Sequence, residues 1–354
     1  MMQEVLHSFG FDPEQFELSP LGSGLIHQTW LVKAGGVGSY VLQEVNTSVF
    51  KKPGDIAANM DLLEQHLREF HPAYFLPLPI KTLTGKPFVQ LKGETFRMFH
   101  FVRNSHAFTR CETPQQAYEA ARQFGNFTAA FSHFNAEKLN LTIPGFHDLS
   151  HRWAQFQYAI KNGSKERLKK NQNDIDLFSK GYSIVETFEL IKSDKDFKQH
   201  VIHHDTKISN ILFDDMDKGI CVIDLDTVMP GYFISDLGDM MRTYLSPADE
   251  EEKDFSKISI RTEYVEAILK GYLEKMSVCL SEKEIRYCFY SGEFMIYMQA
   301  LRFMTDHLNN DQYYGARYEN HNLVRALNQI CLLEQYRKIK PEFQSVMASF
   351  GSPS

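Results

Sequence analysis

Short apolar segments with an alternating pattern occupy most of the first hundred residues, and glycines or prolines separate several of them. Alternation with a period of two is typical of β-strands. We predict strands at Phe16–Leu21, Ile26–Lys33, Tyr40–Val45, Phe88–Leu91 and Thr95–Val102. Between the third and fourth of these, apolar residues recur at helical spacing and predict a helix over Asp55–Phe70, with Asp55 as its N-cap, that packs on the sheet.

From Pro114 onward the apolar residues recur every three to four positions, which is typical of helices. We predict helices at Pro114–Phe134, Asp148–Ile160, Asp174–Ile191, Ile260–Met276, Ser281–Leu308 and Arg317–Ile339. This change of pattern predicts an α+β, bilobal chain. A small lobe, residues 1–103, would hold an antiparallel sheet and one helix, and a larger, mainly helical lobe would cover residues 104–354.

The segment around Asp205 interrupts the helical pattern and carries the densest group of chemically active side chains. It reads His203-x-Asp205-x4-Asn210, followed by two short apolar runs and then Asp224. The runs predict two short strands joined by a polar turn at Asp214–Gly219. A hairpin of this length would bring Asn210 and Asp224 side by side at one end.

These residue types suit phosphoryl transfer, which needs positioning and charge neutralisation from the protein. Asp205 could orient an acceptor hydroxyl and accept its proton. Asn210 and Asp224 offer the hard oxygen ligands that Mg²⁺ prefers beside nucleotide phosphates. A structural role is the alternative for any one of these residues, but the full set at this spacing is uncommon in unrelated sequences.

Six segments together resemble the aminoglycoside phosphotransferase and choline kinase family, and within it the N-acetylhexosamine 1-kinase branch. They are Leu21–Trp30, Val41–Asn46, His203–Asn210, Val222–Gly231, Leu301–Asp306 and His321–Leu323. The resemblance implies a protein-kinase-like fold, ATP as phosphoryl donor and Mg²⁺ as cofactor. It also implies that Asp205 is the base or hydroxyl-orienting residue, with Asn210 and Asp224 as metal ligands.

In kinases of this fold, a glycine loop covers the nucleotide phosphates and a lysine on the third strand holds them. Gly22, Ser23 and Gly24 follow the first predicted strand and are expected to form that loop. Gln43 stands where the lysine is sought, and an amide carries no positive charge. We therefore expect the charge at the phosphates to come from elsewhere, largely from Mg²⁺.

The resemblance implies that Asp226 and Arg302 contact the acceptor, which we predict to be the anomeric 1-hydroxyl of an N-acetylhexosamine. Arg302 and Asp306 are four residues apart, so a simple intrahelical ion pair is the alternative for Arg302. The competing functions are a kinase of an aminoglycoside, choline or amino alcohol, and a nucleotide-binding pseudoenzyme that serves as a scaffold. A cationic acceptor would need acidic groups, and the run Asp249–Glu252 is one source of them.

Composition narrows the remaining function classes. A net charge of −7 over 354 residues disfavours a nucleic-acid surface, and the sequence has no apolar run of membrane-spanning length. The start of the chain lacks the basic-then-apolar pattern of a signal peptide. Five scattered cysteines predict free thiols in a reducing compartment, so we expect a cytoplasmic enzyme whose partners are a nucleotide and a sugar.

Overall fold

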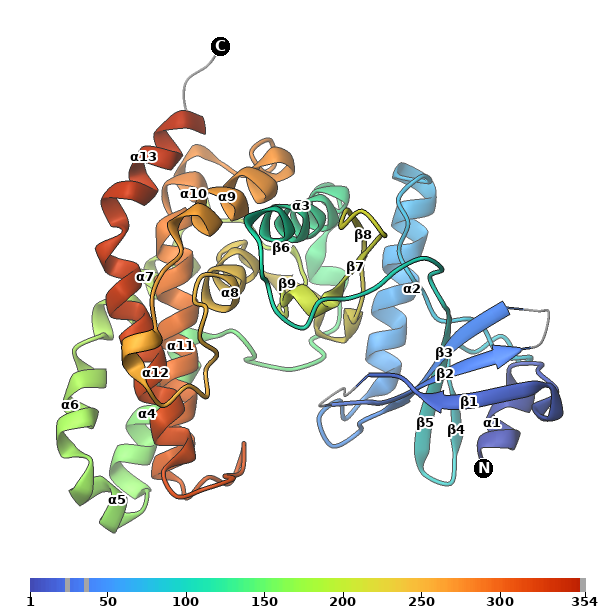
Figure 1. Cartoon of the computed structure of the whole chain (residues 1–354), viewed down its shortest axis with the longest axis horizontal. Coiled ribbons are helices and arrows are strands. Elements are labelled where there is room, and N and C mark those ends of the chain that lie inside the picture. The colour runs from blue at the N-terminus through green and yellow to red at the C-terminus, as the bar shows by residue number, and fades with distance from the viewer. Residues whose placement is uncertain (23–25, 35–37, 351–354) are drawn as a thin grey trace.

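The computed structural model describes residues 1–22, 26–34 and 38–350. Two of the residues expected to form the phosphate loop, Ser23 and Gly24, lie outside the described residues. The molecule is elongated, with a twisted sheet at one end and a body of helices at the other (Figure 1). This arrangement confirms the expected α+β, protein-kinase-like fold, while the lobe boundary after residue 103 stays a prediction.

The small lobe is built on a five-stranded antiparallel sheet in the order β1-β2-β3-β5-β4. The strands are β1 (Phe16–Pro20), β2 (Gln28–Ala34), β3 (Gly38–Val45), β4 (Val89–Leu91) and β5 (Glu94–His100). Their positions confirm the five strands predicted from alternation. The register places Gln43 of β3 directly opposite Arg97 of β5, so these two side chains share one face of the sheet.

A short N-terminal helix, α1 (Met2–Ser8), covers the other face of this sheet (Figure 1). Its Val5 and Leu6 are buried with the inward residues of the strands, such as Leu42 and Phe96. These residues form a small core of their own. The sequence pattern did not predict α1, because two turns give too few repeats to establish a helical period.

The predicted helix after β3 is α2 (Pro53–Phe70), which stands between the sheet and the helical body (Figure 1). Its Ile56 and Met60 belong to the core of the large lobe, which also takes in Val45 at the end of β3. The expected N-cap, Asp55, is wrong: the helix begins at Pro53, whose fixed φ suits a first turn. Thus α2 joins the sheet to the large core.

Most of the large lobe consists of helices, and its described residues form eleven helices of at least five residues. They are α3 (Pro114–Ala130), α4 (Leu149–Asn162), α5 (Lys165–Lys170), α6 (Gln172–Ser179), α7 (Tyr182–Ser193), α8 (Ile234–Tyr244), α9 (Thr262–Met276), α10 (Glu282–Arg286), α11 (Cys288–Leu308), α12 (His321–Lys338) and α13 (Lys340–Phe350). In the middle of this body, α11 packs against α12 and α8, while α3 packs against α9.

Several of these helices differ from the predicted ones. The helix expected over Asp174–Ile191 is two helices, α6 and α7, and the one expected from Ser281 is α10 followed by α11. At the first break, a Cβ on Gly181 would meet the Tyr297 ring of α11, so the chain turns there without a side chain. The sequence pattern also missed α5, α8 and α13.

Two small antiparallel pairs lie between the lobes (Figure 1). One pairs β6 (His200–Ile202) with β9 (Met229–Gly231), and the other pairs β7 (Ile211–Phe213) with β8 (Gly219–Val222). The second is the predicted hairpin. The chain leaving β5 reaches it directly, because His106 and Phe213 exchange two backbone hydrogen bonds of 2.9 and 2.8 Å.

The five cysteines are free thiols, as expected. None of the helices in the described part of the chain combines the length and apolar character needed to cross a bilayer.

Candidate active site

The loop that carries Asp205 is held from one side by helix α8. The Asp236 carboxylate accepts hydrogen bonds from the backbone N–H groups of His203 (2.9 Å) and His204 (2.7 Å). His204 adopts a left-handed conformation with φ 66°, which is uncommon outside glycine. Burial raises the pKa of Asp236 to about 6, although the two N–H groups and His203 act against this rise.

A second carboxylate on α8 completes this support. Asp239 accepts a hydrogen bond from the backbone N–H of Thr206 (2.9 Å), and the Thr206 hydroxyl donates to the carbonyl oxygen of Asp236 (2.9 Å). The Tyr244 hydroxyl donates to the carbonyl oxygen of Thr206 (2.5 Å). Through these contacts, Asp236 and Asp239 fix the backbone of the loop.

Asp205 is oriented by two neighbours on its own loop. The Asn210 side-chain amide donates to a carboxylate oxygen of Asp205 (3.1 Å) and to its backbone carbonyl (2.8 Å). The Lys207 ammonium lies 3.1 Å from the other carboxylate oxygen. Burial alone would raise the pKa of Asp205, but Lys207 and His203 outweigh it and lower this pKa. Asp205 is thus held ionised; sequence reasoning did not identify Lys207 as its partner.

The β7–β8 hairpin brings Asn210 and Asp224 to the same end, as predicted. Ile211 pairs with Val222, and the backbone N–H of Ile223 donates to the Asn210 carbonyl (2.9 Å). Asp224 has a left-handed backbone with φ 61°. Burial, together with the nearby carboxylates of Asp226 and Asp205, raises the pKa of Asp224 to about 6.

This end of the hairpin fits a divalent cation. Within the described residues, no hydrogen bond or ion pair reaches the Asp224 carboxylate. The amide nitrogen of Asn210 is already used by Asp205, which leaves its oxygen as a ligand. Hard oxygen donors beside an uncompensated carboxylate are the set that Mg²⁺ prefers. The atoms of His27 and Asp226 also lie within 4.8 Å of Asp224, but those two residues already bond to each other.

The Asp226 carboxylate bonds to two residues of the small lobe. Its side chain is 1% exposed, and its carboxylate accepts hydrogen bonds from both terminal nitrogens of the Arg97 guanidinium, one of them at 2.9 Å. His27 reaches the same carboxylate at 2.8 Å. These partners lower the pKa of Asp226 to about 2 against the opposing effect of burial. Both carboxylate oxygens of Asp226 thus bond to the small lobe, and the expected contact between Asp226 and the acceptor stays a prediction.

Gln43 lies where the third-strand lysine was sought. Its side-chain oxygen accepts a hydrogen bond from Nε of Arg97 (3.1 Å). Glu64 on α2 does not join this group; it pairs instead with Arg68 at 2.6 Å near the surface. Sequence reasoning missed both His27 and Arg97. The available signal for Arg97 was a single charged residue in the middle of an apolar strand.

Arg302 lies on α11 with aromatic neighbours. Its guanidinium is 5.4 Å from the centre of the Phe146 ring and 5.5 Å from that of Tyr314, and it donates to the Gln299 side chain (3.0 Å). The alternative of an Arg302–Asp306 pair is wrong, since no described carboxylate pairs with Arg302.

Asp306 has a separate role, because it holds the loop that follows α11. Its carboxylate accepts hydrogen bonds from the backbone N–H groups of Tyr313 (2.7 Å) and Tyr314 (2.9 Å) and from the Asn322 amide (3.1 Å). These bonds position Tyr314 beside Arg302.

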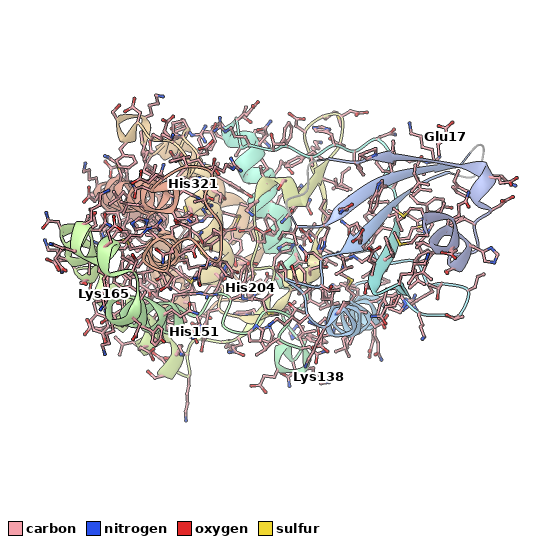
Figure 2. All side chains as sticks on the ribbon, turned by 90° about the horizontal axis from the view of Figure 1, so that it is seen from below. Glu17, Lys138, His151, Lys165, His204 and His321 are labelled. Carbon is pink, nitrogen blue, oxygen red and sulfur yellow. The ribbon has the colours of Figure 1, made fainter. Side chains whose placement is uncertain are left out.

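The Arg302 group adjoins the catalytic loop through a row of rings. The His204 ring lies 5.2 Å from that of His147 and 6.3 Å from that of Phe146, measured between ring centres. Figure 2 shows the labelled His204 near the middle of the molecule, between the sheet and the helices. One side of the Asp205 loop thus faces the small lobe, and the other faces Phe146 and Arg302.

A family model described as the phosphotransferase enzyme family matches residues 17–277, which include the sheet, the catalytic loop and the hairpin. The chain belongs to this family. It is accordingly an ATP-dependent phosphotransferase that acts, with a divalent metal ion, on a hydroxyl group of a small molecule.

Solved structures share the fold over nearly the whole chain. An aminoglycoside phosphotransferase from Alicyclobacillus acidocaldarius has a TM-score of 0.62 at 11% identity, covering 98% of this chain and 96% of that one. A microcompartment-associated aminopropanol kinase has a TM-score of 0.59 at 15% identity, covering 97% of each chain. An ethanolamine kinase from Plasmodium vivax has a TM-score of 0.59 at 13% identity, covering 98% of this chain and 90% of that one. Their acceptors differ, so this likeness supports the fold and leaves the acceptor open.

Proposed function

We propose that this phosphotransferase is a sugar 1-kinase that transfers the γ-phosphoryl group of ATP to the anomeric hydroxyl of an N-acetylhexosamine. The observation that carries this proposal is the charge on the helical side of the Asp205 loop. There Arg302, which pairs with none of the described carboxylates, lies among rings and amide groups. Such a surface suits a neutral, hydroxyl-rich ligand that stacks on rings and accepts or donates hydrogen bonds.

A cationic acceptor is disfavoured because the acidic run Asp249–Glu252 is already paired with cations of the protein. Each side chain of Asp249–Glu252 already faces a cation, and the cations are Arg110, Arg242, Arg325, Arg317 and Lys257. A choline or aminoglycoside site would need free carboxylates to balance the ligand's charge. A pseudoenzyme is disfavoured by the organised group of Asp205, Asn210 and Asp224.

In the proposed reaction, Asp205 orients the 1-hydroxyl and accepts its proton as the new bond from oxygen to the γ-phosphorus forms and the bond to ADP breaks. The anomeric hydroxyl is the most acidic hydroxyl of a free sugar, so a single carboxylate suffices. Lys207 keeps Asp205 ionised until the proton arrives. Asn210 and Asp224 would hold Mg²⁺, which when bound neutralises charge on the phosphate oxygens.

The direct test is a screen of ADP release with free hexoses, N-acetylhexosamines, aminoglycosides and choline, using the Asp205→Asn variant as the blank. We expect turnover with an N-acetylhexosamine and a product that no longer reduces alkaline copper, because a 1-phosphate blocks the anomeric carbon. A reducing product, or turnover restricted to cationic acceptors, would remove the sugar 1-kinase assignment and leave the family assignment intact.

A further inference from the structure

The small lobe delivers one buried cation to the metal-binding end of the hairpin, and it does so from an unexpected strand. Arg97 lies on β5, directly opposite Gln43 of β3, and is 4% exposed. Gln43, at the position that holds a lysine in related folds, is neutral, and its side-chain oxygen accepts a hydrogen bond from Nε of Arg97. The positive charge on this face of the sheet thus lies on the neighbouring strand β5 instead of on β3.

All three nitrogens of Arg97 are committed. Nε donates to Gln43 (3.1 Å), and the two terminal nitrogens bind the two oxygens of Asp226. This paired arrangement is the rigid, charge-assisted form of an arginine–carboxylate contact. Because it is so fully buried, the guanidinium acts on the site through Asp226 rather than by reaching the nucleotide itself.

His27 adds a second tie from the small lobe to the same carboxylate. Its Nδ1 accepts a hydrogen bond from the backbone N–H of Asn46 (3.1 Å), so in the neutral ring the proton lies on Nε2. That nitrogen donates to Asp226 (2.8 Å). Arg97 is consequently the group that neutralises Asp226, and His27 fixes its orientation.

Asp226 is only two residues from Asp224: it lies in the short 3₁₀ helix Leu225–Thr227, and Asp224 is the N-cap residue of that helix. Their carboxylate oxygens lie within 4.8 Å, where two negative charges repel strongly unless one is neutralised. We propose that Arg97, through Asp226, is the positioning residue that fixes the metal-binding Asp224 against the nucleotide-binding sheet. In this role Arg97 supplies the positive charge of the small lobe at the site, as a third-strand lysine would, but does not contact phosphate. This proposal uses the family's ATP and metal chemistry and does not depend on the identity of the acceptor.

The test replaces the whole pair by apolar groups, in Arg97→Met/Asp226→Leu, because removing one partner would leave a buried charge unpaired. We expect a folded protein with a cooperative thermal transition. Its dissociation constant for AMP-PNP with Mg²⁺, measured by calorimetry, should rise about a hundredfold, a change of about 2.7 kcal/mol. With ADP in EDTA, the constant should change less than threefold, since no metal is present to be positioned.

A matched control is Arg167→Met, which removes an arginine paired with Asp311 in the helical lobe at 2.6 Å. It should leave both dissociation constants unchanged. An unchanged Mg²⁺-dependent constant in the folded double variant would reduce Arg97 to a packing role. An equal loss in EDTA would mean that Arg97 contacts the nucleotide directly and would overturn the positioning role.

If the double variant does not fold, Arg97→Lys decides the matter. Lysine keeps the charge but loses the two-pronged contact, so the Mg²⁺-dependent constant should rise about tenfold with the EDTA constant unchanged. Wild-type values for Arg97→Lys in both conditions would overturn the proposal, because charge alone would then suffice without the fixed geometry. A sugar that fails as acceptor has no bearing on either result.

Discussion

At the scale of single residues, Asn210 and Lys207 orient the carboxylate oxygens of Asp205, which prepares this group to accept one proton. We predict that Asp205→Asn lowers turnover by about a hundredfold or more, the usual contribution of a positioned acid–base group. The amide keeps the shape, so nucleotide affinity should stay within about twofold. Steady-state kinetics with calorimetry checks both values, and near-normal turnover would contradict the role given to Asp205.

Asp224 gives the metal-free enzyme a pH dependence with a definite sign. Its pKa in the folded state is raised to about 6 from an unfolded value near 3.8, so the folded state binds the proton more tightly. Without metal, this group's effect lowers folding stability as pH rises from about 4 to about 6. We predict that Asp224→Asn melts at a higher temperature than the wild type at pH 7 in EDTA, and that the gap closes near pH 4. A lower melting temperature at pH 7 would contradict this expectation.

A substitution of Arg302 tests the acceptor hypothesis most directly. We predict that Arg302→Met raises KM for the acceptor about tenfold or more, because an oxygen of the bound acceptor then loses its charged hydrogen-bond donor. KM for ATP should change little. Arg337→Met, which removes a partly exposed arginine of α12 paired with Glu293 of α11 at 2.7 Å, is the control and should change neither constant.

At the scale of elements, the loop after α11 is organised by one side chain. Asp306 accepts three hydrogen bonds, two of them from the backbone of Tyr313 and Tyr314. We predict that Asp306→Ala costs about 1–3 kcal/mol of unfolding free energy, since buried donors lose their partner. It should also raise KM for the acceptor through Tyr314, while KM for ATP stays the same. Urea unfolding and kinetics measure the two effects.

The elements found from sequence are those whose period repeats often enough. The strands of the sheet, the β7–β8 hairpin and long helices such as α2 and α9 met this condition. The short helices α1 and α5 did not, and α8 was hidden because its apolar stripe is shared with Asp236 and Asp239. The break at Gly181 depends on Tyr297, which is distant in sequence, so no local pattern could reveal it.

The same distinction applies to the site. The hairpin length predicted that Asn210 and Asp224 would meet, because both lie at one end of a local structure. The partners of Asp226 could not be found this way, since Arg97 and His27 are 129 and 199 residues away in sequence. Only the register of β3 against β5 brings Arg97 to the face that meets the hairpin.

At the scale of the whole molecule, one buried amide fastens α2 to the large lobe. Asn59 is 1% exposed; its nitrogen donates to the carbonyls of Asn140 (2.9 Å) and Val228 (3.2 Å), and its oxygen accepts the N–H of Asn140 (2.7 Å). We predict that Asn59→Ala lowers the unfolding free energy by about 1–3 kcal/mol, because these groups are left unsatisfied. Asn162→Ala, which removes an exposed amide bonded only within its own helix, should change it by less than about 0.5 kcal/mol. Equal effects in urea denaturation would contradict the fastening role.

The shared core of α2 has a consequence for how the protein opens. The sheet and α1 bury a small set of side chains among themselves, whereas Ile56, Met60 and Leu63 of α2 are buried with the large lobe. Units that share a core tend to open together, and smaller units open more easily. In native-state hydrogen exchange, the amides of α2 should therefore exchange with the slow group of α3 and α11. Those of β1 and β2 should exchange sooner, although they lie in the same first seventy residues of the chain. A cut between residues 103 and 104 would then separate α2 from the body with which it is expected to unfold.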